Sequence, residues 1–582
     1  MNFLRTSDGP VHAIVYAVIR RVAFLLIVLL LSACISAQQA TDNAERIVRG
    51  IVVNAVTHEP VGRALVCSPD NRFAMLTDSE GHFEFTLPRV DIRGQNSLAG
   101  EGQLQQGWSI RTDGGIPWLR ARKPGFLDDP SEIRPPDMSP DSERRIFLMP
   151  EALIKGRVIL SAADAAIGVN VQIFSRQVQE GIPHWIPGIS IQANSNGGFR
   201  FAELLPGSYK LVTHELMDND PAATVPGGQL YGFPPVYYPS ATDFAAASTI
   251  QLSAGQTFHA DISLVRQSYY SVRIPVVNVD PNVLMNMNIT VSPQGHHGPG
   301  YSLGYNAEKQ RIEGLLPNGN YLVEAAMFGS ILAAGAVNIA VAGAPVEGPG
   351  MTLAGNSSIP LHVKEEFSTR DWKGSASMMI EGRTIRLHGP RLYLQVSAEA
   401  ADDFEQHRGG SIRPPTGPND DSLVIENLAS GRYWLRLSSS RGYVAAATMG
   451  GIDLLHEPLV VAAGSSTPIE ITMRDDTAEI DGTVAGITAR SMTTSATAYV
   501  YCVPLPDSSG QFQPLSVSPE GKFDSQTMAP GTYRVIAFKT PQPNLPYRDA
   551  EAMRAYETKG QVVHLSPGQK TTLQLQIISG SE

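Results

Sequence analysis

The side chains with the clearest potential to bind a ligand are aromatic and lie between residues 183 and 239. Trp185 stands in the segment PHWIPG, and Tyr231, Tyr237 and Tyr238 stand in the segment LYGFPPVYYP. We expect both segments to be loops of one domain, where rigid aromatic side chains lose little entropy on binding. Sugar rings present C–H groups that stack on aromatic faces. The four residues therefore suggest a carbohydrate-binding platform, and the alternative is that they pack these loops onto the domain.

The sequence gives weaker evidence for catalytic side chains than for ligand-binding ones. The sequence contains no HExxH zinc motif and no phosphate-binding glycine loop. The carboxylate pairs Asp402-Asp403 and Asp420-Asp421 stand in polar stretches, where we interpret them as solvated loop charge. The alternative is a hydrolase site, which needs two carboxylates roughly 5–10 Å apart in a pocket. We predict no catalytic residue, no metal and no cofactor.

A short phrase recurs along the chain and indicates how such side chains would be positioned. It reads LLPGSYKL, LLPNGNYL, LASGRYWL and MAPGTYRV, with its tyrosines at Tyr209, Tyr321, Tyr433 and Tyr533. Apolar and polar residues alternate around a Gly-containing turn, as expected for a turn that leads into a strand. We predict a structural role for the four tyrosines. We expect each ring to be buried and each hydroxyl to donate to a backbone carbonyl, as in the tyrosine corner of immunoglobulin-like folds.

The composition favours an all-β chain of several domains. The 582 residues are 42% hydrophobic and 17% charged, and they include 53 glycines and 42 prolines, which suit turn-rich β-sandwiches better than helical bundles. One short helix is expected over residues 549–560. A net charge of −11 without a basic stripe argues against nucleic acid as a partner. Cys67 and Cys502 lie far apart in apolar runs, so we expect two buried free thiols.

The N-terminus predicts export. Arg20 and Arg21 precede a ten-residue apolar run, which is too short to span a bilayer and is typical of a secretory signal over residues 1–37. The segment LSAC that ends at Cys34 resembles a lipobox, which implies that Cys34 becomes the lipidated first residue. The alternative is cleavage after Ala37 and a soluble secreted chain. We expect a lipid-anchored protein of the outer membrane or periplasm, or an extracellular one.

The repeat spacing predicts a tandem array of about five immunoglobulin-like or prealbumin-like β-sandwiches after the signal segment. Their expected bounds are 46–150, 151–266, 267–355, 356–476 and 477–579. The third and fourth are degenerate, because they lack the Gly-x-Phe that precedes the phrase elsewhere.

These motifs resemble a known family. GIVVNAVTHEPVGRALV and TDSEGHFEF in the first unit, together with LLPGSYKL in the second, are similar to the carboxypeptidase regulatory-like domain, a prealbumin-like sandwich close to the Cna-B domain. The segment that follows Tyr231 also resembles repeat proteins of Gram-negative bacteria. The resemblance covers most of residues 46–578 and is firmest in the first, second and fifth units. It implies a seven-stranded sandwich and a relation to carbohydrate-binding folds.

The sequence thus favours a non-catalytic envelope or secreted protein. Its partners would be a carbohydrate or a surface protein, with the membrane reached through the lipid, or it would act as a surface spacer. The alternative from a different class is an accessory or cryptic glycoside or peptide hydrolase, which would use carboxylates of the two degenerate units.

Overall fold

A computed structural model describes most of the chain after the N-terminal segment. The described residues are 46–67, 74–87, 119–128, 144–161, 168–218, 228–277, 286–294, 298–328, 333–368, 374–380, 382–402, 409–417, 420–462, 464–485, 498–506, 508, 510–518 and 520–578. The signal segment, its Cys34 and Asp403 lie outside them. Among the described residues there is no helix long and apolar enough to span a bilayer. Cys67 and Cys502 are buried and free, as predicted.

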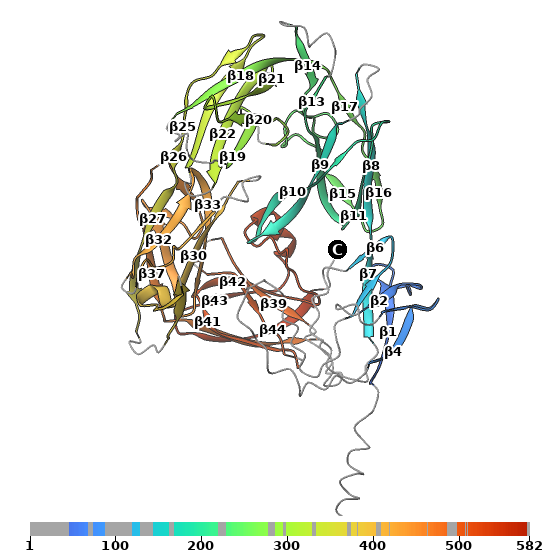
Figure 1. Ribbon diagram of the computed structural model, residues 1–582. Coiled ribbons are helices and arrows are strands. Elements are labelled where there is room, and N and C mark those ends of the chain that lie inside the picture. The colour runs from blue at the N-terminus through green and yellow to red at the C-terminus, as the bar shows by residue number, and fades with distance from the viewer. Residues whose placement is uncertain are drawn as a thin grey trace, which may run out of the picture. The chain divides into compact units, whose positions relative to one another are not determined.

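Nearly all regular elements of the described chain are β-strands, as the composition predicts (Figure 1). By its contacts it divides into two compact units, residues 1–123 with 136–148, and residues 124–135 with 149–582. We call the five successive strand sets repeats 1 to 5. Repeat 1 contains β1 (Arg46–Asn54), β2 (Leu65–Cys67), β3 (Ala74–Leu76), β4 (His82–Leu87), β5 (Arg120–Arg122), β6 (Phe126–Asp128) and β7 (Arg144–Pro150).

The strands of repeats 2 and 3 follow in the second unit. Repeat 2 contains β8 (Ala152–Leu160), β9 (Asn170–Gln179), β10 (Ile182–Gln192), β11 (Gly198–Leu204), β12 (Gly207–Thr213), β13 (Leu216–Met217), β14 (Leu230–Phe233), β15 (Ile250–Leu252), β16 (Thr257–His259) and β17 (Ile262–Leu264). Repeat 3 contains β18 (Gln267–Val277), β19 (Asn286–Pro293), β20 (Leu303–Asn306), β21 (Arg311–Pro317), β22 (Gly319–Phe328), β23 (Ala333–Val341), β24 (Val346–Glu347), β25 (Met351–Thr352) and β26 (Ala354–Gly355).

Repeats 4 and 5 complete the second unit. Repeat 4 contains β27 (Ser357–Glu366), β28 (Ser377–Ile380), β29 (Arg383–Arg386), the 3₁₀ turn η3 (Gly389–Leu392), β30 (Leu394–Ala400), β31 (Gly409–Ser411), β32 (Leu423–Leu428), β33 (Gly431–Ser439), β34 (Tyr443–Met449), β35 (Ile452–Asp453), β36 (Leu459–Val461) and β37 (Ile469–Arg474). Repeat 5 contains β38 (Ala478–Ala485), β39 (Tyr499–Pro504), β40 (Gln513–Leu515), β41 (Lys522–Met528), β42 (Gly531–Phe538), α2 (Ala550–Met553), η4 (Arg554–Tyr556), β43 (Gln561–Leu565) and β44 (Lys570–Ile578).

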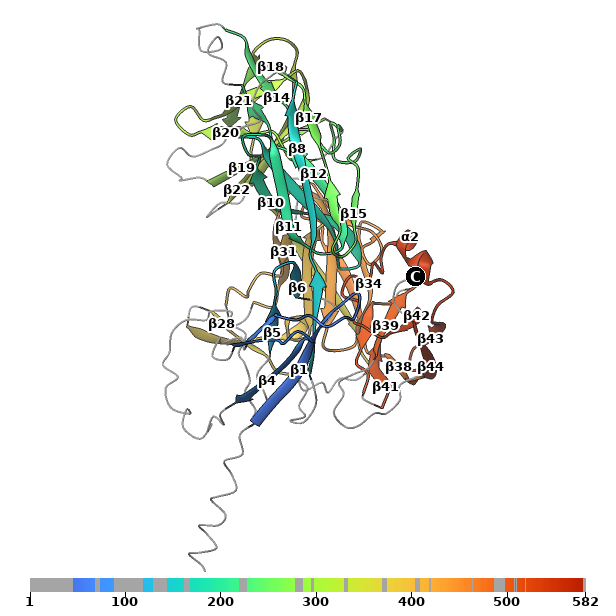
Figure 2. The ribbon, with the colours of Figure 1, turned by 90° about the vertical axis from the view of Figure 1, so that its right-hand side faces the viewer.

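The helix expected over residues 549–560 is one short α-turn followed by a 3₁₀ turn (Figure 2). The Asp549 side chain caps α2 by accepting hydrogen bonds from the backbone amides of Glu551 and Ala552. The helix is short because the capped turn passes directly into η4, so only α2 has α-helical geometry.

One pairing scheme repeats in all five strand sets. The first strand pairs antiparallel with the strand before the recurrent turn, as β8 does with β11 and β38 with β41. It also pairs parallel with the last strands of the set, as β27 does with β37. In repeats 2 to 5 the strand after the turn belongs to the opposite half of the sandwich, where β12 pairs with β9 and β33 with β30. The degenerate repeats 3 and 4 therefore keep the topology of the others.

A glycine opposite a phenylalanine explains two of the sequence motifs. In repeats 1, 2 and 5 the glycine of the first strand pairs across the ladder with the phenylalanine of Gly-x-Phe, and these pairs are Gly50–Phe83, Gly156–Phe199 and Gly482–Phe523. A Cβ added to Gly482 would lie 2.5 Å from Cζ of Phe523. The glycine thus leaves room for the ring to lie flat across its strand, a known way to stabilise a strand glycine.

Each repeat of the second unit has its own hydrophobic core. The clusters centre on Phe201 in repeat 2, Val323 in repeat 3, Ile425 in repeat 4 and Val535 in repeat 5, and all four side chains are fully buried. A separate core in each repeat is the expected result of burying one face of each sheet against its partner sheet.

The four repeat tyrosines make the same hydrogen bond. Each hydroxyl donates to the carbonyl oxygen four residues earlier: Tyr209 to Leu205 at 2.7 Å, Tyr321 to Pro317 at 3.0 Å, Tyr433 to Ala429 at 2.8 Å and Tyr533 to Ala529 at 2.6 Å. All four rings are buried. The bond closes the turn before the core strand and satisfies a carbonyl that would otherwise be buried without a donor.

Replacing Tyr533 by phenylalanine should lower the free energy of unfolding of repeat 5 by about 1–2 kcal/mol. The variant loses the donor to the Ala529 carbonyl and the acceptor of the Gln511 amide. Denaturant unfolding followed at repeat 5 measures the change. Tyr305→Phe, at a half-buried ring of repeat 3, is the control and should change stability by less than about 0.5 kcal/mol. If both variants lost the same free energy of unfolding, the hydrogen bonds of the Tyr533 hydroxyl would not be what stabilises repeat 5.

Repeats 2 and 3 share a sheet. Strands β13 and β14 leave repeat 2 and join the sheet of β18, β21 and β20. The Glu215 carboxylate lies at this junction and accepts a hydrogen bond of 2.7 Å from the Ser302 amide through Oε1. Its Oε2 and the Tyr269 hydroxyl are buried without hydrogen-bond partners. Burial raises the pKa of Glu215 to about 7, because the charged form loses its hydration.

We expect the junction to be more stable in mild acid. The folded-state pKa of Glu215 is about 7 against an ordinary 4.5, so the stabilisation is fully present below pH 4.5 and is lost as the pH rises through 7. Thermal unfolding at pH 5 and pH 8 should therefore differ more for the parent than for Glu215→Gln. The comparison of the two proteins cancels the opposite effect of His214, whose pKa is lowered by burial. If Glu215→Gln had the same pH dependence of thermal stability as the parent, protonation of Glu215 would not be the cause of that dependence.

Candidate functional site

The predicted aromatic platform is not a loop cluster. Trp185 lies on β10, an edge strand, and Tyr231 lies on β14. The prolines around Trp185 suggested a loop, but an edge strand tolerates proline because its outer N–H groups need no partner. The pairing of β9 and β10 is irregular just after Pro187. The loop prediction for both segments is therefore wrong at these two residues.

The structure brings together only two of the four predicted residues. The Trp185 ring lies 5.6 Å from that of Phe244, and the Tyr237 ring lies 5.8 Å from it on centroids. Tyr237 is buried, and its hydroxyl donates to the Pro299 carbonyl at 2.7 Å. Lys210 donates to the Phe244 carbonyl, with its Nζ 5.1 Å from the Trp185 ring centre. These side chains form a small second core outside the main core of repeat 2.

The other two predicted residues lie in different surroundings. Tyr231 packs under the guanidinium of Arg266, 4.1 Å from its ring centre. Tyr238 packs edge-on against Phe258 at 6.1 Å and is partly buried against the main core of repeat 2. The four rings therefore lie in three separate sets of contacts and do not form the predicted platform.

The predicted carboxylates of repeat 4 have structural partners. Asp420 accepts hydrogen bonds from Thr416 and Ser422 and forms an ion pair with Arg413 at 2.8 Å. These hydrogen bonds, the one from Ser422 foremost, hold the pKa of Asp420 well below its usual range. Asp402 pairs with Arg432 at 3.5 Å. A carboxylate with a lowered pKa is a poor proton donor, so Asp420 is unsuited to act as the acid of a glycosidase.

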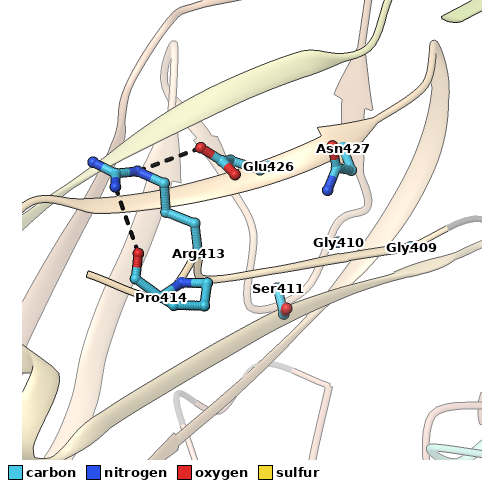
Figure 3. A pocket seen from close by; sticks show the side chains of 7 residues that line it. All are labelled: Gly409, Gly410, Ser411, Arg413, Pro414, Glu426 and Asn427. Carbon is cyan, nitrogen blue, oxygen red and sulfur yellow. Dashed lines mark hydrogen bonds and ion pairs between the residues drawn. The ribbon is translucent and has the colours of Figure 1, made fainter. Parts of the chain in front are cut away.

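A pocket of about 370 Å³ lies beside these residues in repeat 4 (Figure 3). Gly409 and Gly410 are among its lining residues, and the side chains of Arg413 and Glu426 point toward one another with 3.3 Å between Nε and Oε1. The Arg413 guanidinium also donates to Ser422 at 2.8 Å. Since its donors are used within the repeat, the pocket offers a ligand few unused polar groups.

A larger cavity of about 1,040 Å³, which we call the aromatic groove, lies between repeats 4 and 5. Its walls carry Trp434 of β33, Tyr501 of β39, and Phe512 and Tyr547 of repeat 5. The tip of the β9–β10 hairpin, at Glu180 and Gly181, closes one side of it.

Direct contacts fix the two sides of the groove. The His456 Nε2 lies 2.9 Å from the Ser508 carbonyl oxygen, and the Gln511 amide nitrogen donates to the Val444 carbonyl at 3.3 Å. The Arg548 guanidinium lies 5.3 Å from the Trp434 ring centre. Hydrogen bonds and a cation–π contact thus join repeats 4 and 5 around the cavity.

One wall of the groove is a stack of aromatic rings. Phe512 and Tyr547 are parallel within 2° at 3.9 Å, and Tyr501 continues the stack 6.0 Å from Phe512. Gly181 faces the outer side of Tyr547, and its carbonyl accepts a 3.0 Å hydrogen bond from the Arg548 amide. The rings are packed on both sides, so the wall is rigid.

The recurrent phrase positions Trp434. Along β33 the side chains of Tyr433 and Leu435 are buried in the core, whereas Trp434 and Arg436 project from the opposite face. The residue after the repeat tyrosine is Lys210 in repeat 2, Leu322 in repeat 3 and Arg534 in repeat 5. Sequence reasoning missed Trp434. The available signal was a tryptophan at the outward position of a repeated strand, where nothing in the core requires it.

Comparisons with known proteins yield distant structural likenesses. No family model and no curated protein matches the sequence. The chain is similar to the Bacillus anthracis TIE protein at 11% identity over 73% of each chain, with a TM-score of 0.13. It is similar to the shaft pilin SpaA of Lactobacillus rhamnosus GG at 10% identity over 36% of this chain and 98% of that one, with a TM-score of 0.12. It is similar to the minor pilin GBS52 of Streptococcus agalactiae at 11% identity over 35% of this chain and 98% of that one, with a TM-score of 0.16. At these values the likenesses carry no argument about function.

Proposed function

We propose that this protein is an exported, non-catalytic carbohydrate-binding protein made of tandem carboxypeptidase regulatory-like β-sandwiches, and that the aromatic groove is its ligand site. The observation that carries the proposal is the half-buried Trp434 on the outer face of β33, in the wall of a cavity of about 1,040 Å³. A cavity of this size fits a ligand of several rings.

The lining of the groove suits sugars. Aromatic side chains offer apolar surface to the C–H faces of sugar rings, and a few polar side chains fix the orientation. The polar side chains of the lining are Gln511, Gln513 and Gln542, together with Ser438 and Ser439. The side-chain nitrogens of the three glutamines also donate hydrogen bonds within the protein. Amides and hydroxyls both donate and accept, as the hydroxyl groups of a sugar do.

The same lining favours binding over hydrolysis. Glu180 and Glu557 are the carboxylates among the described residues of the groove, and Glu180 forms an ion pair with Arg436 at 3.1 Å. A hydrolase needs one carboxylic acid to protonate the leaving group and a second carboxylate opposite it. The hydrolase alternative predicts new reducing ends when the protein is incubated with a polysaccharide that it binds.

Replacing Trp434 by alanine should weaken polysaccharide binding roughly ten- to a hundredfold, which corresponds to about 1.4–2.8 kcal/mol. Affinity electrophoresis or calorimetry against a panel of neutral and acidic polysaccharides measures the loss, and circular dichroism checks that the variant is folded. Trp185→Ala is the matched control and should bind as the parent does.

The opposite binding result for the two tryptophan variants would place the ligand site in repeat 2. If Trp185→Ala lost binding while Trp434→Ala kept it, the aromatic residues of repeat 2 would be the ligand site. If no polysaccharide bound to the parent, carbohydrate binding would be excluded for the panel tested.

A spacer role is the second candidate, and one observation favours it. Because β14 of repeat 2 pairs with β18 of repeat 3, the backbone hydrogen bonds of one sheet cross from one repeat to the next. Such a continuous sheet resists bending between the repeats. This candidate predicts a stiff particle in small-angle scattering and no polysaccharide ligand.

A further inference from the structure

The aromatic groove has a charge opposite to that of the chain. Among the described residues that line it are four arginines and two glutamates, whereas the whole chain has a net charge of −11. The arginines are Arg436, Arg534, Arg548 and Arg554. A cationic cavity in an anionic protein attracts negatively charged ligands and repels positively charged ones.

Most of this positive charge is not neutralised within the protein. Arg436 pairs with Glu180 at 3.1 Å. Arg534, Arg548 and Arg554 form no ion pair with a carboxylate anywhere in the described part of the chain. Arg534 donates to the backbone carbonyls of Glu557 and Lys559, which leaves its charge uncompensated.

The free charge lies next to the aromatic surface. The Arg548 guanidinium is 5.3 Å from the ring centre of Trp434 and 5.9 Å from that of Tyr547. Arg548 and Arg554 are both exposed and border the short helix α2. A guanidinium binds a carboxylate through two parallel hydrogen bonds, so a ring that carries a carboxylate would contact both kinds of group at once.

We propose that the ligand of the aromatic groove is an acidic polysaccharide of uronate type, whose rings pack on Trp434 and whose carboxylates bind Arg548 and Arg554. The inference rests on the carbohydrate-binding function proposed above and specifies its substrate class. The pairing of aromatic surface with unpaired arginines distinguishes this groove from the pocket at Arg413, whose charge is matched by Glu426 and Asp420.

An acidic peptide is the competing ligand, and the sheet edge beside the groove argues against it. Peptides commonly add as a strand to an exposed edge. Strand β40 is an edge strand that lines the groove, and its central residue is Pro514; the other edge strand of this sheet, β41, contributes only Thr527 to the lining. Proline has no N–H to donate to an added strand, so this edge cannot form a regular ladder with a peptide.

The test compares a polyuronate with its methyl ester, which has the same sugar backbone without the charge. The parent should bind the polyuronate at least tenfold more tightly than the ester, and this preference should shrink as the salt concentration rises. The double variant Arg548→Gln/Arg554→Gln should lose the preference and keep its affinity for the ester. The matched control Arg145→Gln/Arg200→Gln removes two exposed arginines outside the groove and should behave as the parent does.

The outcomes separate this inference from the proposed function. Equal affinity of the parent for the acid and the ester would overturn the inference and leave carbohydrate binding in place. Absence of binding to both polymers and to neutral polysaccharides would overturn both. Competition by poly-glutamate as strong as that by the polyuronate would show that the groove selects charge alone and would overturn the assignment to a sugar.

Discussion

A Gly156→Val variant is expected to unfold repeat 2 at a temperature where the rest of the chain stays folded. A Cβ at Gly156 would lie 1.7 Å from the Ala260 carbonyl oxygen and 2.9 Å from Cζ of Phe199. The carbonyl belongs to the backbone that lies against β8, so the contact cannot be relieved by turning a side chain. Overpacking against backbone should cost at least about 3 kcal/mol of unfolding free energy, which lowers the melting temperature of a domain of this size by roughly 10–20 °C.

Calorimetry of the full chain measures this shift, because each repeat has its own core and can give its own transition. The matched control is Gly355→Val in repeat 3, where an added Cβ has no atom within 4 Å. Valine suits a strand, so the control should unfold as the parent does. If both variants had the parent's melting curve, the pairing of Gly156 with Phe199 would not determine the stability of repeat 2.

A Gly181→Val variant is expected to open the aromatic groove and to reduce ligand binding more than tenfold. Gly181 has φ +80°, and an added Cβ would lie 2.6 Å from the Tyr547 ring. The side chain must push Tyr547 away, and Tyr547 is stacked on Phe512 at 3.9 Å. The ring stack and the hydrogen bond from the Arg548 amide to the Gly181 carbonyl should be lost together.

The backbone strain of this variant has its own control. Gly343 has φ +78° and no atom within 4 Å of an added Cβ. Gly343→Val therefore carries the same left-handed strain, about 1–2 kcal/mol, without the contact to a ring. Polysaccharide affinity should fall for Gly181→Val and stay at the parent's value for Gly343→Val. Unchanged affinity in both would show that the hairpin tip does not support the groove.

The fold could be predicted because its signals are local and repeated. The phrase around Tyr209, Tyr321, Tyr433 and Tyr533 contains a turn and a core strand within eight residues, and four copies identify a unit that occurs along the chain. In repeats 1, 2 and 5 the phenylalanine of the Gly-x-Phe motif also pairs with a glycine of the neighbouring first strand. Degenerate repeats 3 and 4 keep the topology without that pair, because alternating burial on the two faces of each sheet suffices to build the sandwich.

The candidate site could be predicted only in part. The prolines around Trp185 predicted a loop. The segment is instead strand β10, which tolerates these prolines because it lies at the edge of its sheet. Trp434 stands in an ordinary repeat phrase, and its partners Phe512 and Arg548 come from the next repeat, about 80 to 110 residues later. Contacts between repeats leave no periodic pattern in a single sequence. The groove therefore became apparent only from the packing of repeats 4 and 5.

Hydrogen–deuterium exchange of the intact protein, with and without a uronate oligosaccharide, tests most directly whether the aromatic groove is the ligand site. We expect slower exchange in the backbone amides of residues 434–443, 510–514 and 542–557, with no change elsewhere. Protection confined to residues 182–192 and 230–239 would contradict it and would place the ligand on the aromatic residues of repeat 2.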